Sequence, residues 1–107
     1  MLRVGGIWVS PAEIEAALAE HDAVLECAVV GVPDENRLVK PKAYVVLRPG
    51  TAASSALGED MHADLRQRLA HFKCPRWIEF VPALPKTATG KIQRFKLREA
   101  AATALAS

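Results

Sequence analysis

The sequence predicts one domain of the α+β class, with two or three helices packed on a small mixed sheet of three strands and a short hairpin-like segment at the N-terminus. Apolar residues recur at helical spacing in residues 60–72, whereas residues 24–32 form a nearly continuous apolar run typical of a buried strand. A chain of 107 residues can bury a core without disulfides or metal. We therefore expect residues 1–107 to form a single domain.

The first helix is predicted to run from residue 11 to about residue 21. The segment Ser10–Glu13 has the form of a capping box with proline at the first helical position. Apolar side chains on one face of this helix should turn toward the core, and they are Ile14, Ala17 and Leu18.

Two strands should follow the helix and pair as neighbours. The first covers residues 24–32 and is broken only by the charge of Glu26. Residues 33–36 are typical of a turn, and residues 42–47 are β-branched enough for a second strand, which Pro49-Gly50 stops.

The second half of the chain should continue with a surface loop at residues 51–58 and an amphipathic helix at residues 60–72. Pro75 ends this helix, and the core side chains on its apolar face are Met61, Leu65, Leu69 and Phe72. Residues 76–81 predict a third strand, residues 82–90 a loop with two prolines, and the chain returns to helical composition from Ile92.

The composition excludes several protein classes. Half of the residues are hydrophobic, but no apolar run approaches the ~18 residues of a membrane span. Residues 1–6 lack the pattern of a secretory signal, so we expect a cytoplasmic protein without membrane contact. Cys27 and Cys74 lie far apart without metal-binding spacing, which predicts neither a metal site nor a disulfide framework. The two thiols are expected to be buried small hydrophobes or bystanders.

Positive charge is concentrated in the last third of the chain. Residues 73–107 contain seven Lys or Arg against two Glu, a net charge of +5. Such a segment attracts phosphates, although a solvated helix face gives the same count. Binding of nucleic acid through this segment is the weaker alternative, because its aromatic residues do not interleave with its basic ones as a stacking platform requires.

The loop at Pro85–Lys91 is the most informative segment, with the sequence Pro-Lys-Thr-Ala-Thr-Gly-Lys. It differs from the phosphate-binding loop of nucleotide hydrolases, because Pro85 and Ile92 occupy the positions that require Gly and Ser/Thr. The segment could present an ammonium group to an anion. Without further context, a solvated turn before a helix, in which Gly90 supplies backbone freedom, explains the segment better.

The loop resembles the Pro-Lys-Thr-x-x-Gly-Lys signature of the adenylate-forming superfamily, which includes acyl-CoA ligases, peptide synthetase adenylation domains and luciferases. Residues 5–15 are similar to the glycine loop and helix that open the C-terminal domain of those enzymes. Residues 28–34 and 42–46 resemble two of its strands, so the resemblance covers residues 3–98. The stretches at 6–11, 75–80 and 91–98 look most like benzoate-CoA and hydroxybenzoate-CoA ligases.

The resemblance implies a reaction in two steps. An aromatic carboxylic acid first attacks the α-phosphate of ATP to give an acyl-adenylate and pyrophosphate, and the thiol of CoA then displaces AMP to give a thioester. Lys91 corresponds to the family lysine that bridges the carboxylate and the α-phosphate. Pro85, Lys86, Thr87 and Gly90 form the rest of its motif.

The second step is assigned by the resemblance to other residues. Gly5 and Gly6 correspond to the loop that lines the pantetheine tunnel after the domain rotates, although the loop by itself is better explained as an ordinary glycine turn ahead of a strand. Phe72 and Lys73 match the family segment near the CoA nucleotide, although Phe72 is also explained as a core residue. Cys74 departs from the family, in which some CoA ligases have a basic residue there, and leaves Lys73 or Arg76 as the alternative contact.

The resemblance also implies a large N-terminal domain of the same polypeptide, which holds the ATP site, its Mg²⁺ and the acyl pocket. The 107 residues alone are therefore expected to be catalytically inactive. The alternative within the superfamily is the same lid domain serving an acceptor other than CoA. Relatives carry an acetylated lysine at the position of Lys91, which implies regulation by loss of its charge.

Overall fold

The computed structural model describes residues 2–4 and 7–106, with side chains described from residue 8 to residue 101. Gly5 and Gly6, which the resemblance implicates in thioester formation, lie outside the described residues. No helix in the described ranges combines the length and the apolar character needed to cross a membrane.

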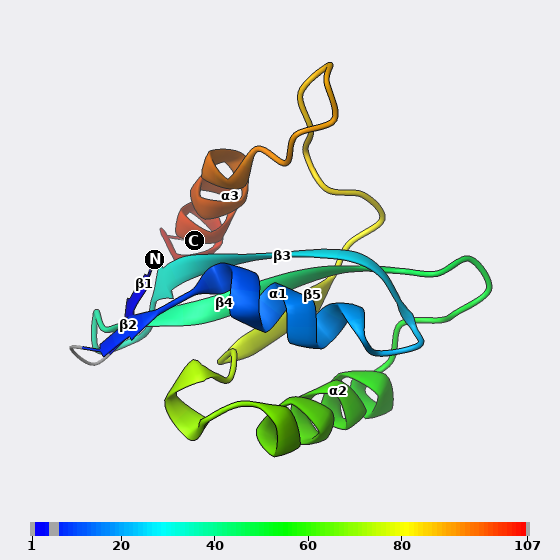
Figure 1. Cartoon of the computed structure of the whole chain (residues 1–107). Coiled ribbons are helices and arrows are strands. Elements are labelled where there is room, and N and C mark those ends of the chain that lie inside the picture. The colour runs from blue at the N-terminus through cyan, green and yellow to red at the C-terminus, as the bar shows by residue number, and fades with distance from the viewer. Residues whose placement is uncertain (1, 5–6, 107) are drawn as a thin grey trace.

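A three-stranded sheet forms the middle layer, in the order β3-β4-β5 (Figure 1). Strands β3 (Val24–Pro33) and β4 (Val39–Leu47) are antiparallel, and β4 runs parallel to β5 (Trp77–Phe80). A parallel neighbour requires a long crossover. Here helix α2 (Ser55–Arg68) supplies it.

Helices cover both faces of this sheet. Helices α1 (Pro11–Ala19) and α2 lie on one face, and α3 (Arg94–Ala106) lies on the other (Figure 1). Because side chains alternate across a strand, neighbouring residues of β4 enter two separate cores. Ala43 and Val45 pack with Ile14 and Leu65 from α1 and α2, whereas Tyr44 contributes to the core under α3.

The α+β class, the mixed three-stranded sheet and the three helices are confirmed. The N-terminal hairpin is confirmed as an antiparallel pair of β1 (Leu2–Val4) and β2 (Ile7–Val9). The pairing of the two long strands is also confirmed, and their register shifts between Val24 and Glu26. Leu25 is the extra residue of this bulge and is 51% exposed.

The second helix differs from the prediction at both ends. It begins at Ser55, inside the expected loop, because the side chain of Ser54 caps it by accepting a hydrogen bond from the backbone N of Leu57 at 3.1 Å. It ends at Arg68, after which a short 3-10 helix, η1 (His71–Lys73), precedes Pro75. Met61 and Leu65 are buried as expected, but Phe72 lies in η1 and is 38% exposed.

The capping box predicted at the start of α1 does not form. Pro11 occupies the first turn as expected, but the side chain of Ser10 makes no capping hydrogen bond. The carboxylate of Glu13 turns instead toward η1, where its Oε1 lies 3.0 Å from Nζ of Lys73. This ion pair joins the first turn of α1 to η1, which lies far from it in the chain.

Candidate functional site

The motif loop folds as a small hairpin that carries Lys91. Lys86 and Ile92 form an antiparallel bridge, and the backbone N of Thr87 donates to the carbonyl of Lys91 at 2.8 Å. The Thr87 hydroxyl accepts a hydrogen bond from the backbone N of Lys91 at 3.1 Å. Gly90 adopts a φ of +87°, a conformation that side chains disfavour. Thr87 and Gly90 of the motif thus fix the backbone conformation at Lys91.

The Lys91 side chain is exposed, whereas neighbouring basic residues are paired. Lys86 Nζ lies 2.8 Å from Glu26 Oε2, and Arg94 Nη2 lies 2.7 Å from Glu15 Oε2. Among the described side chains none forms an ion pair with Lys91. Figure 1 shows the loop before α3 projecting away from the sheet. Lys91 is therefore accessible to an anionic group from outside the domain.

Two ion pairs anchor the base of this hairpin. Lys86 binds Glu26, which lies on β3 opposite Val46 and so on the face that α3 covers. Both carboxylate oxygens of Glu15 on α1 lie 2.7 Å from Nη2 of Arg94, the first residue of α3. The backbone N of Gln93 donates to the carbonyl of Pro85 at 2.8 Å and closes the loop between the anchors.

Cys27 lies close to both anchors but is unsuited to chemistry. Burial raises the pKa of its thiol to about 11, with further contributions from the carboxylates of Glu15 and Glu26. A thiol of this kind is almost entirely protonated at neutral pH. Both cysteines are free thiols.

The residues predicted to contact CoA form a second, separate group. Phe72 and Lys73 lie in η1, with Nζ of Lys73 5.8 Å from the centroid of the Phe72 ring. Because Lys73 pairs with Glu13 of α1, this group belongs to the face of α1 and α2, whereas Lys86 lies on the face of α3. The residues predicted for adenylation and those predicted to contact CoA therefore lie on opposite faces of the sheet and are not brought together.

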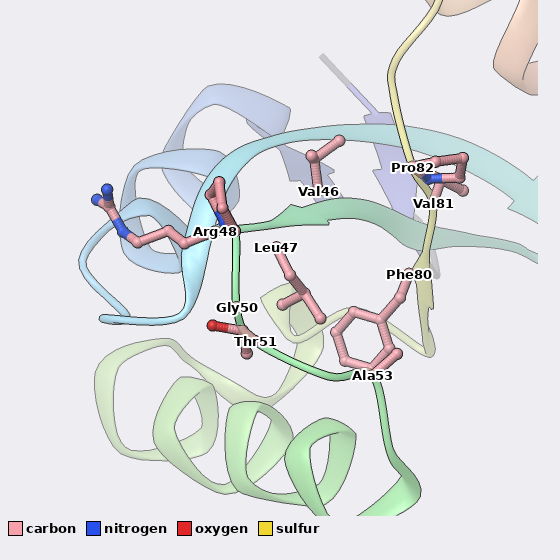
Figure 2. A pocket seen from close by; sticks show the side chains of 10 residues that line it. Val46, Leu47, Arg48, Gly50, Thr51, Ala53, Phe80, Val81 and Pro82 are labelled. Atoms are coloured by element: carbon pink, nitrogen blue, oxygen red, sulfur yellow. The ribbon is translucent and has the colours of Figure 1, made fainter.

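A groove of about 370 Å³ at the ends of β4 and β5 contains none of the predicted site residues. Figure 2 shows the side chains of Leu47 and Phe80 beside it and the guanidinium of Arg48 turned away. Arg48 Nε donates to the carbonyl of Asp22 at 3.0 Å. With this charge engaged elsewhere, the groove offers no arrangement of ionisable groups suited to an anion.

Several interactions could not be foreseen from the sequence. Glu15 and Arg94 are 79 positions apart, and Arg94 stood out only as one of seven basic residues. The Nε2 atom of His21 lies 2.9 Å from Oδ2 of Asp60, a contact that links the residues after α1 to α2. No spacing rule relates such distant residues, so only the fold reveals these pairs.

The chain was compared with known proteins. Residues 13–91 match the model of the AMP-binding enzyme C-terminal domain. The benzoate-CoA ligase of Thauera aromatica is 63% identical over 100 residues, which cover 94% of this chain and 19% of the relative. The 4-hydroxybenzoate-CoA/benzoate-CoA ligase of Rhodopseudomonas palustris is 45% identical over 92% of this chain and 19% of its own length.

The solved structures that are similar to this chain are also CoA ligases. The anthranilate CoA ligase AuaEII in complex with anthranoyl-AMP superposes with a TM-score of 0.96 at 58% identity, over the whole of this chain and 21% of that one. A benzoate CoA ligase of Burkholderia xenovorans LB400 gives a TM-score of 0.80 at 59% identity, over 85% of this chain and 18% of the other. The chain thus spans about a fifth of the length of the relatives it matches. It belongs to the family of AMP-binding enzyme C-terminal domains.

Proposed function

We propose that this chain is the C-terminal domain of an ATP-dependent ligase that converts an aromatic carboxylic acid to its CoA thioester. The observation that carries the proposal is the exposed Lys91 on a hydrogen-bonded hairpin, without an ion-pair partner among the described side chains. The similarity to benzoate-CoA ligases supports the reaction class and the aromatic substrate. The large N-terminal domain of the same polypeptide would hold ATP, Mg²⁺ and the acid.

In the first step Lys91 would stand between two anions. The attacking carboxylate and the α-phosphate of ATP repel each other, and an ammonium group between them lowers that repulsion. A unit charge at ~4 Å and an effective dielectric of ~20 contributes about 4 kcal/mol. This is comparable to the effect of one preorganised electrostatic donor in an active site. Acetylation of Lys91 would remove the charge and is proposed to block this step.

In the second step, the residues on the face of α1 and α2 would bind CoA. Phe72 is exposed enough to stack on the adenine of CoA, and Lys73 beside it can meet a phosphate. The phosphate would compete with Glu13 for the ammonium group of Lys73. Gly5 and Gly6 would admit the pantetheine arm close to the backbone. A domain rotation between steps accounts for two functional groups on opposite faces.

The complete ligase tests the reaction class. Supplied with ATP, Mg²⁺ and CoA, it is expected to form AMP and a thioester from benzoate or a hydroxybenzoate, measured by liquid chromatography. Formation of acyl-adenylate without thioester would point to an acceptor other than CoA. The purified 107-residue chain alone is expected to form no acyl-adenylate, and measurable pyrophosphate release from ATP and benzoate by this chain would contradict the assignment.

Gly90 offers a test of the hairpin itself. An alanine Cβ at Gly90 would have no atom within 4 Å, so Gly90→Ala acts only through its φ of +87°. We expect it to lower the free energy of unfolding by about 1–2 kcal/mol, measured by denaturant titration. In the complete ligase it should also slow adenylation, since the backbone relaxes beside Lys91.

Gly50→Ala is the matched control, because Gly50 has a φ of +88° and equally open space in a different loop. Its effect on stability should be similar, and adenylation should remain at the wild-type rate. Equal losses of adenylation in the two variants would exclude a specific role for the hairpin.

A further inference from the structure

Glu15 bridges the two faces of the sheet around its open edge. Strand β3 lies at one end of the order β3-β4-β5, so every second backbone N–H of β3 points away from β4. The N–H of Val29 is one of these, and it donates to Glu15 Oε2 at 2.8 Å. The same carboxylate, 17% exposed, binds Arg94 at 2.7 Å with both oxygens.

This arrangement fixes the start of α3 to both β3 and α1. Arg94 lies three residues after Lys91, and the backbone between them is held by the bridge of Lys86 to Ile92 and the bond from Gln93 to Pro85. These bonds restrict the backbone that connects Arg94, which Glu15 binds, to Lys91. A change at Glu15 is therefore transmitted to the position of the hairpin.

Resting on the proposed function, we infer that Glu15 is a positioning residue for the adenylation step, which acts through Arg94 on the placement of Lys91. The role follows from its simultaneous bonds to the edge of β3 and to the first residue of α3. Among the described residues no hydrogen bond or ion pair joins the side chains of Glu15 and Lys91, so Glu15 acts on Lys91 through Arg94.

Glu15→Gln is the decisive variant. Glutamine has the same shape and keeps an acceptor for the Val29 N–H, but it loses the charge that holds Arg94. In the complete ligase we expect roughly a 10- to 100-fold lower rate of acyl-adenylate formation, the size of effect that a misplacement of about 1 Å produces. Thioester formation from preformed acyl-adenylate should stay within about 3-fold of wild type, because that step does not use Lys91.

The same substitution in a Lys91→Ala background separates positioning from a general structural role. If Glu15 acts through Lys91, the double variant should form acyl-adenylate no more than about 2-fold slower than Lys91→Ala alone. Multiplied losses would overturn the inference, as would a wild-type rate for Glu15→Gln. Glu20→Gln is the matched control at the C-cap of α1, since Glu20 pairs with Arg68 of α2 and not with α3, and it should leave adenylation unchanged.

These outcomes distinguish the inference from the function on which it rests. Normal adenylation by Lys91→Ala would contradict the proposed function itself. Slow adenylation by Lys91→Ala with normal adenylation by Glu15→Gln would contradict only the positioning role. Thermal unfolding of each complete ligase variant should give a midpoint close to wild type, and a Glu15→Gln variant that loses both half-reactions equally would show a structural role and overturn the inference.

Discussion

Replacement of Lys91 by alanine in the complete ligase is expected to lower the rate of acyl-adenylate formation about 10²- to 10³-fold, the effect of removing one preorganised electrostatic group. The side chain is exposed, so its loss should leave folding intact. Thioester formation from supplied acyl-adenylate should change by less than about 3-fold, because the lysine is proposed to serve the first step alone. Pyrophosphate release and thioester production, measured separately, give the two rates.

Two variants control this experiment. Lys96→Ala removes an exposed lysine from the same basic segment, and both half-reactions should remain at wild-type rates. Lys91→Gln imitates the neutral acetylated side chain and should match Lys91→Ala. An equal loss of both half-reactions in Lys91→Ala would assign the lysine to substrate binding in general and contradict its role in adenylation.

The elements with strong local patterns could be predicted from the sequence. The apolar run of β3 and the spacing of Met61 and Leu65 in α2 predicted the correct type of element. The reason is that the side chains on a buried face must be apolar, so their spacing along the chain follows the period of the strand or helix. The boundaries of α2 were wrong at both ends, because the helix was expected at residues 60–72 and spans Ser55–Arg68. Ser54 caps the helix at its start, and nothing in the adjacent Ser55 distinguishes it as a helical residue.

The candidate site could be predicted only in part. The motif and its lysine were visible from the family resemblance, and the structure shows that the Lys91 side chain is exposed, while its role in adenylation stays a prediction. The anchors of the hairpin were not visible, because Glu15 and Glu26 lie far from Arg94 and Lys86 in the chain. These ion pairs form because β3 is an edge strand and because α3 begins beside that edge. Neither the edge strand nor the position of α3 is known before the fold is assembled.

Leu65→Ala is expected to have the largest effect on the stability of the chain. Leu65 is 1% exposed and, with Met61, forms the buried face by which α2 packs against α1 and the sheet. Truncation removes buried apolar volume and leaves a cavity, at a cost of about 2–5 kcal/mol. A domain of this size has a total stability of roughly 5–15 kcal/mol, so the midpoint of denaturant unfolding should fall markedly.

The two cores make this variant a test of whether both faces unfold together. Trp77 packs against the core under α3, on the face opposite Leu65. Trp8 also fluoresces, so Trp77 emission is recorded in a Trp8→Phe background. If the sheet couples the two cores in one cooperative unit, Trp77 fluorescence and helical circular dichroism should report the same shifted midpoint in Leu65→Ala. Gln67→Ala, at an exposed position of the same helix, should change stability by no more than about 0.5 kcal/mol. A Trp77 transition that stays at the wild-type midpoint while the helical signal shifts would mean that α3 and the Lys91 hairpin are held independently of α2, and that the anchors at Glu15 and Glu26 suffice to maintain them.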